Sequence, residues 1–135
     1  MLTIKEQGLL MSIIKHCKKI NEKMNGLTRE QFDNDEDVFQ IICFNLLQIG
    51  ELAKSFEPTF IAKYNGAPWR QIKGMRDKVA HAYGAIDMDR VWDTALNDIN
   101  PLIGYCRKIL NDNKWNCITV VHNRYFSLVD RIEKV

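Results

Sequence analysis

The chain has 135 residues, a length that favours a single domain built around one hydrophobic core. Its 19 Lys and Arg residues against 17 Asp and Glu residues give a net charge of +2, well short of the strongly basic character of a general nucleic-acid coat. With 46% hydrophobic residues and 3 prolines, the composition is typical of a globular protein and excludes a disordered or collagen-like chain.

No membrane or secretion signal is expected. The longest run without a charged residue is 38–50, only 13 residues, whereas a membrane-spanning helix needs about 20. Lys5 and Glu6 precede any apolar block, so we expect no signal peptide. The 4 cysteines have no C-x-x-C spacing, which argues against a zinc site and favours reduced, buried thiols in a cytoplasmic protein.

Residues 3–24 are predicted to form the first helix, because their apolar side chains recur at spacings of three and four. These side chains are Leu10, Ile13, Cys17, Ile20 and Met24. Gly26 is expected to end the helix. The pattern Thr28-x-x-Gln31 then resembles a capping box for a brief helical turn.

A second helix is predicted around 38–56, where the same spacing returns and the preceding acids, 35–37, suit the positive end of a helix dipole. Its apolar stripe is Val38, Ile42, Leu46, Ile49, Ala53 and Phe56. Asn45 and Gln48 interrupt this apolar helix. We expect satisfied core amides or exposed residues there, and a place in a cleft stays open. Pro58 is expected to close the helix.

Two shorter segments follow. Residues 59–64 are predicted to form a helical turn that ends at Asn65-Gly66, a pair that favours the left-handed conformation. Pro68 suits the first position of a helix, which is predicted over 69–83. Gly74 lies inside that helix and could mark a bend.

The last helical pattern opens at Asp87, a plausible N-cap. Its stripe is Trp92, Leu96, Ile99, Ile103, Cys106 and Leu110. Pro101 lies within the pattern, so a kink is expected near Asn100. No strand pattern interrupts 3–110. The predicted fold is therefore all-α, an up-down bundle of four to five helices.

The tail differs from the rest of the chain. Residues 117–121 are β-branched and could pair with 124–129 as a hairpin, while a C-terminal helix is an equal alternative. The predicted organisation is one helical domain over 1–112, followed by a C-terminal extension of uncertain structure over 113–135.

Basic residues gather between Pro58 and Ile86. This segment carries five basic residues against one acid, Asp77, so its local charge is +4 in a chain whose total is +2. The basic residues are Lys63, Arg70, Lys73, Arg76 and Lys78. Such a patch attracts phosphate groups, and Arg70 and Lys73 are candidate phosphate-binding residues, although a solvated helix face has the same composition.

Within the patch, the residues Arg76-Asp-Lys-Val-Ala-His81-Ala-Tyr83 combine complementary chemistry. The His81 imidazole titrates near neutral pH and can accept or donate a proton, while Arg76 stays charged and matches phosphate oxygens. Asp77 precedes His81 by four residues and could orient it on a helix. An arginine and a histidine suffice for metal-free RNA cleavage, because the 2′-hydroxyl of RNA supplies the nucleophile.

Arg76 and His81 do not share a helix face. Five residues correspond to about 140° around the axis and roughly 7.5 Å along it. Two copies of the segment facing one another across a twofold axis would bring both residue types into one cleft. The spacing therefore favours a composite site in a dimer, while an ordinary surface histidine remains the alternative. His16 and His122 are expected at the surface.

The chain resembles a known family through five ordered motifs. They are Gln48-Ile-Gly-Glu51-Leu-Ala-Lys, Ala67-Pro68-Trp69-Arg-Gln-Ile72, Gly74-Met-Arg76-Asp-Lys-Val-Ala-His81-Ala-Tyr83, Val91-Trp92 and Pro101-Leu102. In these residues the chain looks like the HepT-like proteins of the HEPN superfamily, over roughly 4–111. The resemblance implies a dimeric helical bundle that acts as a metal-independent endoribonuclease toxin, without a cofactor, in a bacterial or archaeal toxin–antitoxin pair.

The resemblance also implies roles for individual residues. Arg76 and His81 fall on the catalytic positions, with Asp77 and Lys78 beside them as supporting residues. Tyr83 falls on the tyrosine that a cognate minimal nucleotidyltransferase antitoxin adenylylates, which would place bulk and negative charge where RNA phosphate binds. Asp77 departs from the asparagine often present after the arginine. The alternative function is a non-catalytic, nucleotide-binding or scaffold subunit that docks with a nucleotidyltransferase.

Overall fold

The computed structural model describes residues 1–81 and 87–113, and for 78–81 it describes only the backbone. Every regular element in this part of the chain is a helix, which confirms the predicted all-α fold. The helices are α1 (Ile4–Met24), α2 (Arg29–Asn34), α3 (Glu36–Lys54), α4 (Pro58–Lys63), α5 (Trp69–His81), α6 (Met88–Asn97) and α7 (Ile99–Asp112).

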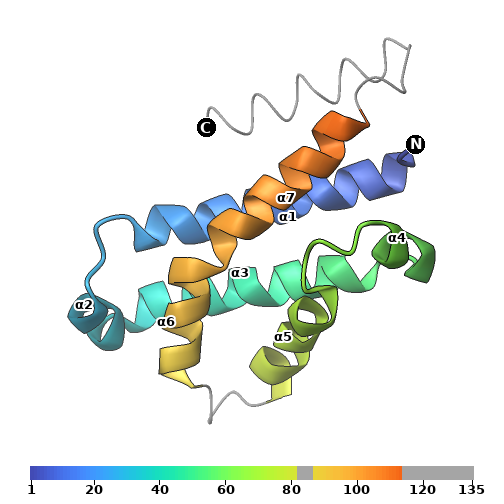
Figure 1. The fold of residues 1–135 in the computed structure, drawn as a ribbon. Coiled ribbons are helices and arrows are strands. Elements are labelled where there is room, and N and C mark those ends of the chain that lie inside the picture. Colours follow the sequence, from blue (N-terminus) through green and yellow to red (C-terminus); the bar gives the residue numbers. More distant parts are fainter. Residues whose placement is uncertain (82–86, 114–135) are drawn as a thin grey trace.

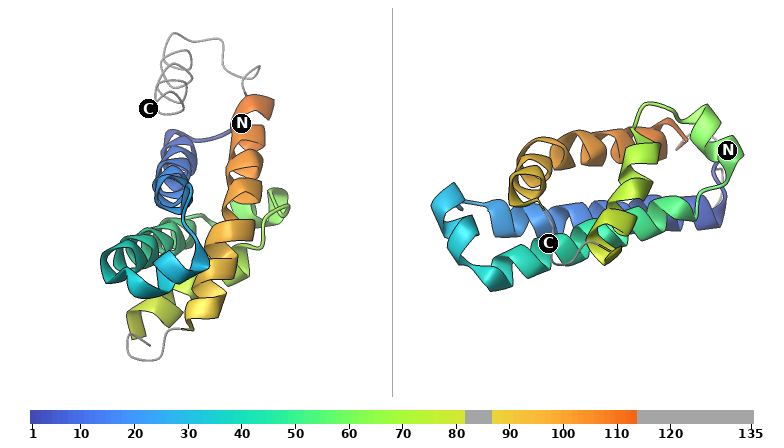
Figure 2. Two further views of the ribbon diagram at one scale, coloured as in Figure 1. Left: turned by 90° about the vertical axis from the view of Figure 1, so that its left-hand side faces the viewer. Right: turned by 90° about the horizontal axis from the view of Figure 1, so that it is seen from below.

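Four helices determine the architecture. Helices α1 and α3 lie side by side, α7 packs along α1, and α5 crosses the C-terminal half of α3 (Figure 1). The short helices α2 and α4 lie at opposite ends of α3, and the view from below shows α5 crossing over it (Figure 2). The site residues of α5 are therefore positioned chiefly by α3.

The α1–α3 core follows the predicted apolar stripes. Leu10, Ile13, Cys17 and Ile20 of α1 are fully buried, as are Ile42 and Ile49 of α3. Thr3 and Glu6 form a capping box at the start of α1, while Asp35 caps α3 through the backbone N–H of Val38. Burial raises the pKa of the Cys17 thiol to about 12, as expected for a buried cysteine that takes no part in thiolate chemistry.

The short connections agree with the sequence predictions in two places and differ in two. Thr28 and Gln31 form the predicted capping box of α2, and Gly26 has a positive φ of 71° just beyond α1. Pro58 begins α4 rather than ending the preceding helix, because its missing N–H costs nothing in a first turn.

The predicted left-handed turn at Gly66 is wrong. Gly26 alone has a positive φ among the described residues, so Gly66 does not need glycine for its dihedral angles. The ring of Tyr105 instead occupies the space where a Cβ of residue 66 would lie, and its hydroxyl oxygen accepts a hydrogen bond from the Gly66 N–H at 2.8 Å. Gly66 is thus required for close packing between the α4–α5 connection and α7.

Aromatic side chains fix the start of α5. Trp69 is buried, and its indole N–H donates to the backbone carbonyl of Tyr64 at 2.6 Å. Its ring packs edge-on against Phe56 and Phe60, which stack on each other at 4.1 Å. These contacts tie the first turn of α5 to α4 and to the short segment between α3 and α4.

The predicted kink in the last helix is a complete break at Asp98, two residues before Asn100. Asp87 caps α6 as predicted, accepting from the N–H groups of Asp89 and Arg90. Pro101 is the third residue of α7, where its missing N–H leaves no intrahelical bond unmade. Among the described residues, no helix has the length and apolarity needed to cross a bilayer.

Candidate functional site at the contact of α3 and α5

Helices α3 and α5 approach each other closely at one glycine. A Cβ added to Gly50 would lie 2.8 Å from the Cβ of Arg76, 2.9 Å from its backbone N and 3.0 Å from the carbonyl O of Ile72. Only a residue without a side chain fits between these atoms. The lack of a side chain at Gly50 therefore allows α5 to approach α3 closely, and the Arg76 side chain extends along the surface of α3 from this contact.

Arg76 is held by carboxylates from both helices. Its Nε pairs with Glu51 Oε1 of α3, and its Nη1 donates to Asp77 Oδ1 of α5 at 3.1 Å. The Arg76 side chain retains 33% of its exposure. Hydrogen bonding to Asp77 and the charge of Glu51 raise the pKa of Arg76, so the guanidinium is charged at any physiological pH. The arrangement offers a fixed cation at the protein surface.

Asp77 is shared between two cations. Its Oδ1 also accepts a hydrogen bond from Lys54 Nζ of α3 at 2.9 Å. The bond from Lys54, followed by that from Arg76, holds the pKa of the Asp77 carboxyl below its ordinary value. Glu51, Lys54, Arg76 and Asp77 thus form a continuous ionic network with no net charge, which we call the α3–α5 network.

The other predicted basic residues lie next to this network on α5. Arg70 is exposed and Lys73 is half-buried. Arg70, Lys73 and Asp77 are spaced by three and four residues, which places them along one face of the helix. This face therefore carries two cations and ends at Asp77, the residue that follows Arg76.

The structure locates the remaining predicted residues only in part. Lys78 and His81 lie in the last turn of α5, His81 being its final residue, and the description there ends at the backbone. Tyr83 lies outside the described residues, as do the tail predictions for 114–135. The proposed orientation of His81 by Asp77 therefore stays a prediction. Among the described side chains, Asp77 pairs with Lys54 and Arg76.

Two charged residues of the network had no assigned role in the sequence interpretation. Glu51 and Lys54 were visible only as part of a family motif, but their spacing of three puts them on neighbouring turns of the second helix. A basic segment with one acid needs counter-charges when it folds, and the charged end of an otherwise apolar helix is a natural source. That pattern could have identified Glu51, whereas Lys54 is a further cation and pairs with the one acid of the segment, Asp77.

His16 is not the surface residue that the sequence predicts. Its Nδ1 lies 2.8 Å from Asn45 Oδ1, so that it links α1 to α3, and the Asn45 side-chain amide donates to the carbonyl of Ile41 at 2.8 Å. Asn45 is buried, which confirms the satisfied core amide among the alternatives for that position. Neither residue reaches the α3–α5 network.

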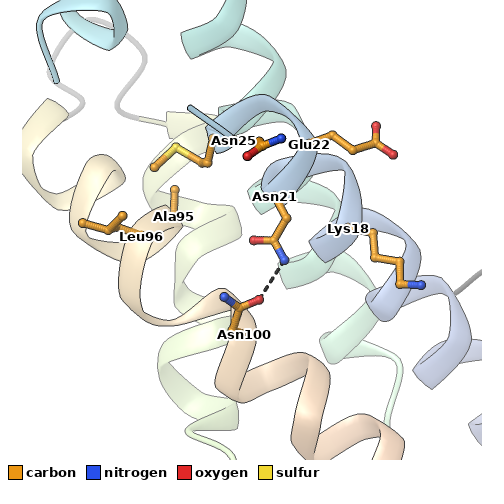
Figure 3. Close-up of a pocket in the computed structure, with 8 residues that line it drawn as sticks. Lys18, Asn21, Glu22, Asn25, Ala95, Leu96 and Asn100 are labelled. Atoms are coloured by element: carbon orange, nitrogen blue, oxygen red, sulfur yellow. Dashed lines mark hydrogen bonds between the residues drawn. The ribbon is translucent and has the colours of Figure 1, made fainter. Parts of the chain in front are cut away.

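A separate surface hollow of about 530 Å³ lies between α1 and the α6–α7 pair (Figure 3). Asn21 donates a hydrogen bond to Asn100 across it at 2.8 Å, and Leu96 lines the opposite side (Figure 3). No residue of α5 lines this hollow, so it is distinct from the candidate site. In the described part of the chain, no group of three His, Cys, Asp or Glu side chains is placed to hold a metal ion.

Comparison with known proteins matches most of the chain to ribonucleases. The family model described as "Ribonuclease HepT-like" matches residues 13–109, a range that contains α3, α5 and the network between them. A protein of Caldanaerobacter subterraneus subsp. tengcongensis named "Putative RNase" is 31% identical over 105 residues, covering 78% of this chain and 94% of the relative. "Probable ribonuclease HepT" of Thermococcus cleftensis is 31% identical over 100 residues, covering 74% and 91%. No solved structure gives a significant match. The chain belongs to the HepT-like ribonuclease family.

Proposed function

We propose that this chain is a metal-independent endoribonuclease that acts as the toxin of a bacterial or archaeal toxin–antitoxin pair. One observation carries the proposal within this family: Arg76, five residues before His81, is a fixed and partly exposed guanidinium at the α3–α5 contact. The exposed Arg70 and the half-buried Lys73 on the same helix support binding of an RNA backbone.

The proposed mechanism divides the work between two side chains. The His81 imidazole takes the proton from the 2′-hydroxyl of RNA, which then attacks the adjacent phosphorus. The Arg76 guanidinium stabilises the negative charge that builds on the phosphate oxygens. A second imidazole protonates the departing 5′-oxygen, and cleavage leaves a 2′,3′-cyclic phosphate.

A dimer would supply that second histidine, and an apolar stretch of α3 supports this part of the proposal. Phe44 is 57% exposed and Ile41 37% exposed, although both are large hydrophobic residues. Phe44 precedes Glu51 by seven residues, almost two turns, so both lie on one face about 10.5 Å apart along the axis. A second copy packed on Phe44 would bring its own α5 near the first.

The test uses purified protein, total RNA and excess EDTA. We expect cleavage to cyclic-phosphate ends, abolished by Arg76→Ala and by His81→Ala but retained in Lys19→Ala, a change of an exposed cation on α1. Mixing the two inactive variants should restore part of the activity if each site draws on both chains. RNA left intact by the wild-type protein would support the scaffold function instead.

Control by a nucleotidyltransferase antitoxin is the remaining part of the proposal. Tyr83 is two residues from His81 in the sequence, so an adenylyl group on its hydroxyl would place a negative charge beside the proposed base. Co-expression with a cognate minimal nucleotidyltransferase should add the mass of one adenylyl group and silence cleavage. A Tyr83→Phe protein that is still modified and silenced would contradict this assignment.

A further inference from the structure

The contact between Glu51 and Arg76 joins two helices at the point where they are closest. Arg76 branches from α5 directly over Gly50 of α3, and the next residue of α3, Glu51, takes the Nε edge of the guanidinium. The Glu51 carboxylate is therefore supplied by a rigid helix and not by a loop. An arginine with several rotatable bonds is restrained by this contact before any substrate arrives.

The second carboxylate on Arg76 is held differently. Asp77 belongs to the same helix as Arg76, and its Oδ1 is divided between Arg76 Nη1 at 3.1 Å and Lys54 Nζ at 2.9 Å. Lys54 offers Asp77 a cation of its own, so Asp77 has a partner when a phosphate competes for Arg76. Among the side chains that the structure describes, Arg76 is the one cation paired with Glu51. A phosphate that binds Arg76 would thus compete with Glu51 for its cation, whereas Asp77 would keep its bond to Lys54.

We propose that Glu51 is a positioning residue for RNA cleavage, which holds the Nε edge of Arg76 against α3 so that the guanidinium is already oriented when the scissile phosphate binds. This inference rests on the proposed ribonuclease function. Glu51 acts through Arg76 and touches no reacting atom. Orientation of this kind raises the rate of the bound complex rather than the affinity for substrate.

The affinity should change in the opposite direction from the rate. A carboxylate beside a bound phosphate repels it, so replacing Glu51 by glutamine removes one negative charge from the path of the RNA. Glutamine keeps the size of the side chain and one acceptor oxygen. The expected result for Glu51→Gln is a kcat about 10- to 100-fold lower with a KM that is unchanged or lower. Glu51→Asp keeps the charge and should recover part of the lost kcat.

The experiment measures kcat and KM for a short single-stranded RNA in a double-mutant cycle. Glu51→Gln is made alone and in an Arg76→Lys protein, because lysine lacks the Nε–H that Glu51 binds. If Glu51 acts through Arg76, the change should have less than about a twofold effect in the lysine background. Glu57→Gln, at the exposed N-cap of α4 where the side chain makes no capping bond, is the matched control for the loss of one acid.

A second readout does not depend on activity. The Arg76 Nε–H should give a ¹⁵N–¹H resonance protected from solvent exchange, assigned by its absence in Arg76→Lys. This protection should be lost in Glu51→Gln and kept in Glu57→Gln. Thermal unfolding of each variant separates positioning from a general loss of folded protein, which would lower the active fraction and leave KM unchanged.

The outcomes separate the two proposals. If Arg76→Ala abolishes cleavage while Glu51→Gln retains the wild-type kcat, the positioning role is overturned and the ribonuclease stands. Equal losses from Glu51→Gln in the arginine and lysine backgrounds would overturn it as well. A wild-type protein that cleaves no RNA overturns the proposed function, and the positioning role with it.

Discussion

Helix α3 packs chiefly against two helices, α1 and α5, and the contacts that it makes with them differ in kind. Toward α1 it presents fully buried apolar side chains such as Ile42 and Ile49, with the His16–Asn45 hydrogen bond among them. Toward α5 it presents a glycine, where the backbones come close, and a partly exposed ionic network beside it. The first contact supplies stability. The second brings charged groups of two helices side by side at the protein surface.

The largest expected effect comes from breaking the first contact. The Ile49 side chain is fully buried. Replacing it by alanine leaves a cavity in the core, which should lower the free energy of unfolding by about 2–5 kcal/mol. Urea denaturation at a fixed protein concentration measures this loss. Cleavage per folded molecule should change little, because the cavity lies away from the α3–α5 network. Leu96→Ala, at a 52% exposed position, is the control and should cost far less.

An intermediate effect is expected from Gly50→Ala. The new Cβ would lie 2.8 Å from Arg76 Cβ, so α5 must shift, and overpacking of this kind costs about 1–3 kcal/mol. The better helix propensity of alanine offsets about 1 kcal/mol of that cost. The cleavage rate should fall by more than the loss of folded protein accounts for, because the displaced residue is Arg76 itself.

Gly104→Ala is the matched control for that change. Gly104 also lies inside a helix, but a Cβ there would meet nothing within 4 Å. This variant should gain about 0.5–1 kcal/mol from helix propensity alone. Equal stability changes at Gly50 and Gly104 would show that the close approach of α3 and α5 is not needed.

The smallest expected effect is that of Lys54→Gln. The Asp77 pKa lies below its ordinary value chiefly because Lys54 donates to it, so this pKa should rise when Lys54 is replaced. A depressed carboxyl pKa stabilises the fold above the unfolded value and loses that contribution as the pH falls through the folded value. Acid unfolding of Lys54→Gln should therefore depend less on pH near that range. A carboxyl NMR titration measures the Asp77 pKa directly, and no shift would contradict the assigned cause.

The two contacts also differ in how much of them the sequence predicts. Period-3.6 apolar stripes identify the α1–α3 core almost residue by residue, because burial of Ile13 or Ile42 is determined by local helix geometry. The pairing of Glu51 with Arg76 joins residues 25 positions apart, and no local rule reports which charged residues of two helices meet. Tyr105 filling the space beside Gly66 is equally non-local.

The ends of the helices show the same limit of sequence-based prediction on a smaller scale. Asp87 and Thr28 are recognisable caps because their hydrogen bonds join residues two or three positions apart. The break at Asp98 is placed less exactly by the sequence, because the proline that signals it lies three residues further along. Charge alone identifies Arg70, Lys73 and Arg76 as candidate phosphate-binding residues. The pairing of Arg76 with Glu51 and Asp77 is visible only in the structure.

The pairing of Arg76 has a consequence for the ionic-strength dependence of RNA affinity. A lone arginine that meets a phosphate releases a condensed counterion from the RNA, which steepens the fall of the association constant with added salt. The Arg76 guanidinium is already paired with the carboxylates of Glu51 and Asp77 before RNA binds. A phosphate that binds there therefore replaces a protein carboxylate. Arg70 and Lys73 should accordingly contribute fully to the slope of log affinity against log salt concentration, and Arg76 only in part.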